Sequence, residues 1–250
     1  MRSPLSIAGA LLAAALWLPA AASAGIEEDM VALDRAYIPA LAVTSQEKLP
    51  ESQRAMALLN RQWAEFKQRN PASRPGDPKW PADVAGIDQF LAETDRIVAA
   101  GGSGLEHAHE VLEGIRATLM DYRTRNKMPY YLDVLTHFHD AMEEIALAAK
   151  DRTPATLGDE QIAKMKTALA AADQRWAAVL AARVEPAFAF TAARQQNLDQ
   201  LLAGQTKALD TLREALAGSD RAAQLKAANG IKPAFAKIYM SFGDFEALRK

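Results

Sequence analysis

All four histidines of the chain lie in two short segments, each of which combines a His-X-His pair with a later glutamate. The segments are "LEHAHEVLEGIR" at 105–116 and "LTHFHDAMEEI" at 135–145, and in both a glutamate follows the second histidine by four residues. Imidazole nitrogens and carboxylate oxygens are ligands of zinc, iron, copper and manganese ions. These segments are therefore the part of the chain whose residue types could bind a transition metal.

If both segments are helical, the spacing decides which of these side chains can act together. Residues two apart lie about 200° apart around a helix axis, so the two histidines of one pair cannot bind the same ion. Residues four apart lie on one face, which selects His109 with Glu113 and His139 with Glu143. We predict that the two glutamates share a metal ion and that the two histidines complete its ligands.

The heights of these residues along the two helices agree with this hypothesis. If helices over 105–126 and 130–148 are antiparallel with a turn centred near Met128, Glu113 and Glu143 lie level. The two histidines then lie about one turn above and below them. Whether the two rows meet or turn away from each other depends on the handedness of the bundle.

Two other interpretations stay open for the same residues. Arg116 follows Glu113 by three residues and can form an ion pair with it, which is typical of a solvated or salt-bridged helix face. Histidines between helices can also make a contact respond to pH, because imidazole gains its charge near neutral pH.

The rest of the sequence predicts an all-α protein. Apolar residues recur at three-four spacing almost everywhere, as in the stripe formed by Tyr131, Leu135, Phe138, Met142 and Ile145. Short Pro- and Gly-containing breaks between long helices favour up-and-down antiparallel bundles, two of them in tandem. We expect a first bundle over 25–150 that contains the His/Glu seam and a second bundle over 151–250.

Three segments share a Pro-Ala core: "IPALA" at 38, "EPAFA" at 185 and "KPAFA" at 232. Proline is favoured in the first turn of a helix, where its missing N–H would be unpaired in any case. We therefore expect a helix to begin at each of them. They are equally compatible with an internal duplication and with an independent preference of helix starts for proline and alanine.

The first 24 residues read as a secretory signal peptide, with one basic residue, an apolar run and a small-X-small site before Gly25. We expect a soluble protein in the periplasm or outside the cell, because no second long apolar run follows that could span a membrane. The chain has no cysteine, which excludes thiolate metal sites, thiol redox chemistry and a Cys-X-X-Cys-His haem attachment.

Charge and motifs narrow the function further. The net charge is −2 with Lys and Arg scattered along the chain, so we expect no nucleic-acid partner. No phosphate-binding loop, nucleophile elbow or zinc-protease motif is present, and we predict no enzymatic activity. The chain is predicted to buffer, carry or sense a metal. The alternative is a cofactor-free periplasmic scaffold or partner-binding module, with a protein partner or a second copy of the chain.

One resemblance to a known family points to haem instead. The stretch "GIEEDMVALDR" resembles the acidic, methionine-bearing opening of periplasmic b-type cytochromes with a four-helix bundle. The resemblance implies a haem bound by Met30 and by a histidine on the last helix. No histidine lies in the last helix of this chain, so His139 would have to be the second ligand.

Overall fold

The computed structural model describes residues 20–71, 77–101 and 104–249, with side chains from residue 25 onward. Most of the predicted signal peptide, residues 1–19, lies outside the described residues. Residues 20–24 form the beginning of the first helix, which continues past Gly25.

The described ranges contain eight α-helices and no strand, which confirms the predicted all-α class. The helices are α1 (Ala20–Ser45), α2 (Leu49–Arg69), α3 (Trp80–Ala100), α4 (Leu105–Arg125), α5 (Tyr131–Ala149), α6 (Asp159–Ala181), α7 (Ala192–Ala217) and α8 (Arg221–Met240). Two short 3-10 helices, η2 (Pro186–Phe188) and η3 (Glu246–Arg249), complete them. Among these helices none is long and apolar enough to cross a membrane.

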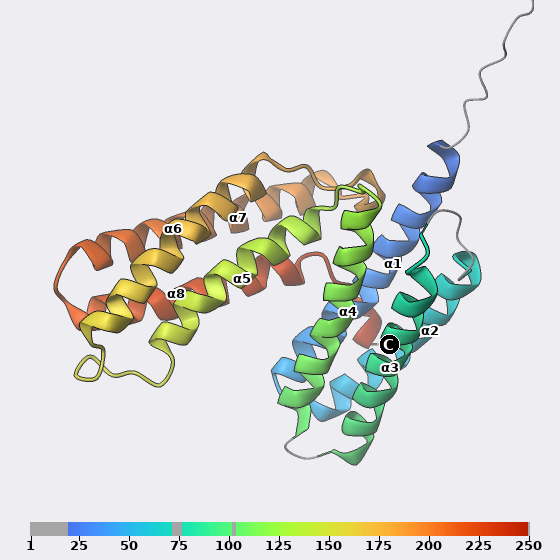
Figure 1. Cartoon of the computed structure of the whole chain (residues 1–250), viewed down its shortest axis with the longest axis horizontal. Helices are drawn as coiled ribbons and strands as arrows, with labels where there is room; N and C mark the ends of the chain where they lie inside the picture. Colours follow the sequence, from blue (N-terminus) through green and yellow to red (C-terminus); the bar gives the residue numbers. More distant parts are fainter. Residues whose placement is uncertain (1–19, 72–76, 102–103, 250) are drawn as a thin grey trace, which may run out of the picture.

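The helices pack in two tandem groups, α1–α4 and α5–α8, as the predicted pair of bundles requires. Figure 1 shows that the helices of the second group run across the direction of the first. Helix α5 packs chiefly on α6 and α8, so the change of group falls in the short connection 126–130. The bundle predicted over 25–150 would include α5, whose contacts lie chiefly in the second group.

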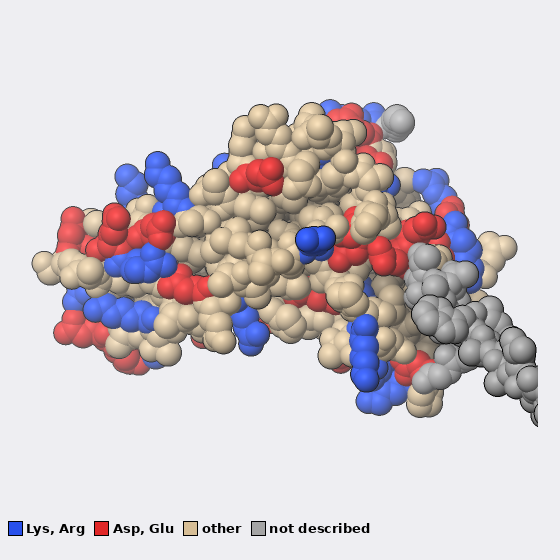
Figure 2. Space-filling view, turned by 90° about the horizontal axis from the view of Figure 1, so that it is seen from above, with Lys and Arg blue, Asp and Glu red and all other residues tan. Residues whose placement is uncertain are grey.

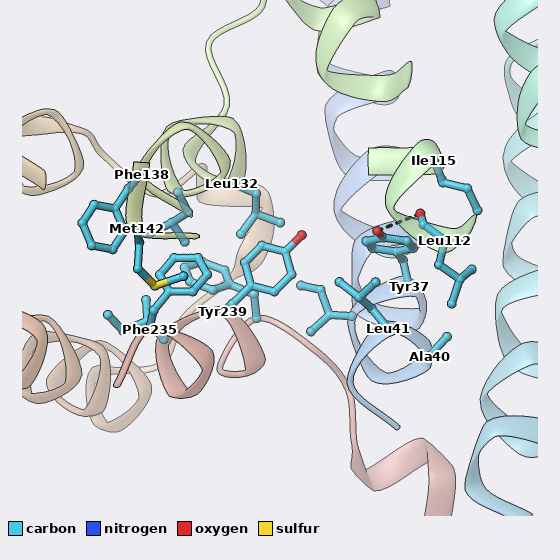
Figure 3. Packing of buried hydrophobic residues seen from close by; sticks show 14 of the residues in the cluster. Tyr37, Ala40, Leu41, Leu112, Ile115, Leu132, Phe138, Met142, Phe235 and Tyr239 are labelled. Atoms are coloured by element: carbon cyan, nitrogen blue, oxygen red, sulfur yellow. Dashed lines mark hydrogen bonds between the residues drawn. The ribbon is translucent and has the colours of Figure 1, made fainter. Parts of the chain in front are cut away.

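The apolar stripes predicted from the sequence form the core. Every member of the α5 stripe is buried, and the ring of Phe138 lies 4.8 Å from that of Trp176 on α6 and 5.6 Å from that of Phe235 on α8. Figure 3 shows how this cluster continues through Tyr239 toward Tyr37 and Leu41 on α1. The core therefore extends across the contact between the two groups.

Two of the Pro-Ala segments do not begin helices, contrary to the prediction. Pro39 lies inside α1 and Pro233 inside α8. Proline has no N–H, so the carbonyl of Arg35 loses its partner within α1. It accepts a bond from the N–H of Asp244 instead, at 2.9 Å. Pro39 therefore frees the group that attaches the C-terminal segment to the first helix.

A glycine allows this attachment. A Cβ atom on Gly243 would lie 2.9 Å from Ile38 and from Pro39, which is closer than real Cβ atoms come to their neighbours. The C-terminal segment can approach α1 this closely only because residue 243 has no side chain.

Charged side chains of both signs are mixed on the surface. On the face in Figure 2 they gather toward the ends of the molecule, and the middle of this face is largely uncharged.

Candidate functional site

A cavity of about 760 Å³ lies where the two helix groups meet, and all four predicted site residues line it. It is bordered by α1 and α4 of the first group and by α5 and α8 of the second. Its lining residues fall into one polar and one apolar set. The polar side chains used below are Glu113, Arg116, His139, Glu143, Lys232 and Tyr239, together with His109.

His109 on α4 is held by a backbone carbonyl. Its Nδ1 lies 3.0 Å from the carbonyl oxygen of Leu41 on α1. A carbonyl oxygen only accepts hydrogen bonds, so Nδ1 carries the proton in the neutral ring. The other nitrogen, Nε2, is then unprotonated and lies 3.8 Å from Oε1 of Glu113, too far for a hydrogen bond. This leaves Nε2 with a free lone pair at the cavity.

His139 on α5 is the more buried of the two, with 16% of its side chain exposed. Burial lowers the pKa of its imidazole, and the positive charge of Arg116 lowers it further, while nearby carboxylates act in the opposite direction. Its ring packs against that of Phe235 on α8, with 5.5 Å between centroids. His139 is therefore neutral at pH 7, the state in which imidazole can coordinate a metal.

Each glutamate is paired with a cation. Oε1 of Glu113 lies 3.0 Å from a guanidinium nitrogen of Arg116. This is the ion pair that the spacing of the two residues made possible. The carboxylate of Glu143 lies 2.9 Å from Nζ of Lys232 on α8. Within the residues the structure describes, no three His, Asp or Glu side chains lie close enough together to hold a metal ion. Each of the two glutamates is thus neutralised by a basic side chain.

The charge balance of the cavity is negative. Its lining contains five glutamates against one arginine and two lysines. The remaining wall is apolar and is formed in part by Ile38, Leu41, Leu147 and Phe235. Two imidazoles in such surroundings suit a cation better than an anion, because the net charge of the lining attracts positive charge.

The other two histidines lie outside this cavity. His107 and His137 are exposed, on the opposite side of their helices from the cavity-facing residues, as the helical period requires. Nδ1 of His107 lies 3.3 Å from the carboxylate of Glu110 on the surface.

Two polar residues of the site were missed by sequence reasoning. Lys232 and Tyr239 come from α8, and Lys232 is 89 positions from its partner Glu143. Tyr239 is buried and shares a hydrogen bond with Arg116. Lys232 opens the Pro-Ala segment "KPAFA", and no pattern in that segment links it to the histidines.

The haem ligand pair implied by the resemblance is not assembled in this cavity. Met30 is fully buried, its sulfur lies 3.8 Å from a guanidinium nitrogen of Arg123, and it is not one of the residues that line the cavity with His139.

No protein-family model matches the chain, and no significantly similar curated protein or solved structure was found.

Proposed function

We propose that this chain is an exported binding protein that holds a transition-metal ion between its two helix groups, through His109 and His139. One observation carries the proposal. A single cavity with an excess of carboxylates is lined by both imidazoles, one from each helix group. Export to the periplasm or the medium is inferred from the N-terminal sequence alone.

The hydrogen bond of His109 supports a coordinating role. Metal-binding histidines usually donate their second N–H to a carbonyl or carboxylate, which fixes the ring and the tautomer. The carbonyl of Leu41 does this for His109. Zinc, copper, iron and manganese all accept imidazole, and the lining residues do not select among them.

The glutamates have a second part in the proposal. They hold Arg116 and Lys232 at the cavity wall, so a bound ion would have to displace one of these cations to gain a carboxylate ligand. A divalent ion that displaces one of these side chains changes the local charge by only one unit, because the side chain it replaces is itself a cation. Such a site suits reversible uptake, which is what a metal buffer, carrier or sensor needs.

The test is the metal content and metal affinity of the chain purified without a His tag. Elemental analysis and calorimetric titration with Zn²⁺, Cu²⁺, Fe²⁺ and Mn²⁺ would be made on the wild type and on His109→Ala/His139→Ala. The matched control is His107→Ala/His137→Ala, which removes the same two side chains from exposed positions. We expect one equivalent of metal in the wild type and the control and at least tenfold weaker binding in the cavity variant, a loss of about 1.4 kcal/mol or more.

Equal loss in both variants, or no binding by the wild type, would contradict the proposal. The alternative of a cofactor-free scaffold or partner-binding module would then be the function to pursue.

A further inference from the structure

A second group of polar side chains is buried at the junction of the helix groups, apart from the cavity. Arg123 on α4 forms a two-point ion pair with Asp133 on α5: Nε lies 2.8 Å from Oδ2, and a guanidinium NH₂ group bonds Oδ1. The guanidinium also lies over the ring of Tyr130, 4.3 Å from its centre. Both charged partners are buried, so this pair joins the last turn of α4 to the first turn of α5.

Asp34 on α1 brings a second carboxylate to the same arginine. Its side chain is buried, and Oδ2 accepts a hydrogen bond of 2.6 Å from the hydroxyl of Tyr130. One cation therefore faces two buried carboxylates. Burial raises the pKa of Asp34 to about 6, the charge of Asp133 adds to this, and Arg123 and Tyr130 only partly oppose it. The hydroxyls of Tyr37 and Tyr239 also face it and carry no positive charge.

Glu185 is a third carboxylate near this arginine, located just before η2 and half-buried. Its Oε1 accepts a hydrogen bond of 2.7 Å from the N–H of Tyr131, one of the unpaired N–H groups in the first turn of α5. Its Oε2 is buried without a hydrogen-bond partner. Burial raises the pKa of Glu185 to about 7, and the carboxylate of Glu27 on α1 acts in the same direction. Hydrogen bonds from the backbone N–H groups of Glu185 and Tyr131 oppose this rise in pKa, and the charge of Arg123 opposes it to a smaller extent.

These bonds lie where the groups are joined. The Asp34–Tyr130 bond links α1 to the beginning of α5, and η2 packs directly on α1. A guanidinium nitrogen of Arg35 on α1 also donates to the carbonyl of Phe188 in η2, at 2.6 Å. These contacts are therefore part of what holds the second group against the first.

We propose that Asp34 and Glu185 form a pH-sensitive clasp, which holds the two helix groups together when both carboxyls are protonated and loosens when they ionise. In the unfolded chain the pKa of Asp34 is near 3.8 and that of Glu185 is near 4.5, and both pKa values are higher in the folded protein. Their stabilising contribution is therefore complete below about pH 4 and is lost as the pH rises through about 6 and 7. The clasp does not depend on what the cavity binds.

The experiment is hydrogen exchange by mass spectrometry on the metal-free full chain between pH 5.5 and 8.5, corrected for the intrinsic pH dependence of exchange. Peptides over 126–136 and 183–191 report on the clasp, and peptides from the middle of α6 and α7 report on the second bundle itself. In the wild type we expect the clasp peptides to lose protection by about tenfold or more over this range, because each pKa unit corresponds to a factor of ten.

The variants Asp34→Asn and Glu185→Gln keep the size of each side chain and remove its charge. Together they should abolish the pH dependence of the clasp peptides, whereas the exposed Glu214→Gln on α7 should leave it as in the wild type. A double variant with the wild-type pH dependence, or equal loss of protection in all peptides, would overturn the proposal. If Asp34→Asn does not fold, Glu185→Gln alone must still remove the part of the transition nearest pH 7.

Discussion

Nδ1 of His109 lies 3.0 Å from the backbone carbonyl oxygen of Leu41, so a side chain of α4 is oriented by the main chain of α1. The two residues are 68 positions apart. The consequence is chemical as well as structural, because the bond determines which nitrogen of His109 carries the proton.

We expect neutral His109 to be the tautomer with hydrogen on Nδ1. Two-bond ¹H–¹⁵N correlation spectra distinguish the two ring nitrogens directly. The exposed His107 and His137 provide reference signals from histidines without such a carbonyl. A protonated Nε2 on His109 would contradict the hydrogen bond and would weaken the case for that nitrogen as a metal ligand.

His139 should titrate below the ordinary histidine value of about 6.5, because it is buried beside Arg116. Its pKa is lower in the fold than in the unfolded chain, so its contribution to stability is present above pH 6.5 and is lost as the pH falls. An NMR titration of the imidazole gives the midpoint. His139→Gln cannot gain a charge, so it should reduce the loss of stability in acid. An equal loss of stability in acid for the variant and the wild type would contradict a lowered pKa of His139.

Replacement of Arg123 should be among the most destabilising single changes. Arg123→Met leaves Asp133 and Asp34 buried without their cation, and removal of one partner of a buried pair costs about 3 to 5 kcal/mol. Arg213 on α7 is half exposed and pairs with Asp173, so Arg213→Met should cost less than about 1 kcal/mol. Urea unfolding curves measure both, and similar costs for the two variants would refute the structural role given to Arg123.

A pair of glycine variants tests the packing of α3 against α4. A Cβ on Gly114 of α4 would lie 2.5 Å from the ring of Phe90 on α3, so Gly114→Ala should destabilise by about 1 to 3 kcal/mol through overpacking. Gly204 on α7 has no atom within 4 Å of that position. Gly204→Ala should therefore stabilise the helix by about 0.5 to 1 kcal/mol. Thermal unfolding of the two variants should shift in opposite directions.

Local properties of the chain were predictable from its sequence. The all-α class, the buried stripe of α5 and the separation of each His-X-His pair onto two faces depend on a repeat of 3.6 residues. Each of these features involves residues within one helix. The Arg116–Glu113 ion pair belongs with them, because its members are one turn apart.

The position of Pro39 could not be predicted from neighbouring residues. Proline is favoured in the first turn of a helix, but Pro39 lies inside α1, where the N–H of Asp244 donates to the carbonyl of Arg35 that the proline leaves without a partner. Asp244 lies near the opposite end of the chain, so the residues around position 39 do not indicate this bond.

Helix periodicity predicted the all-α class, the apolar faces of the helices and the faces on which His109 and His139 lie. It could not predict that α5 packs in the second group, that Lys232 pairs with Glu143, or that one arginine at the junction faces more than one buried carboxylate. The difference lies in the sequence separation of the residues involved. Helix periodicity is set by neighbouring residues, whereas burial and charge pairing depend on contacts between residues far apart in the chain.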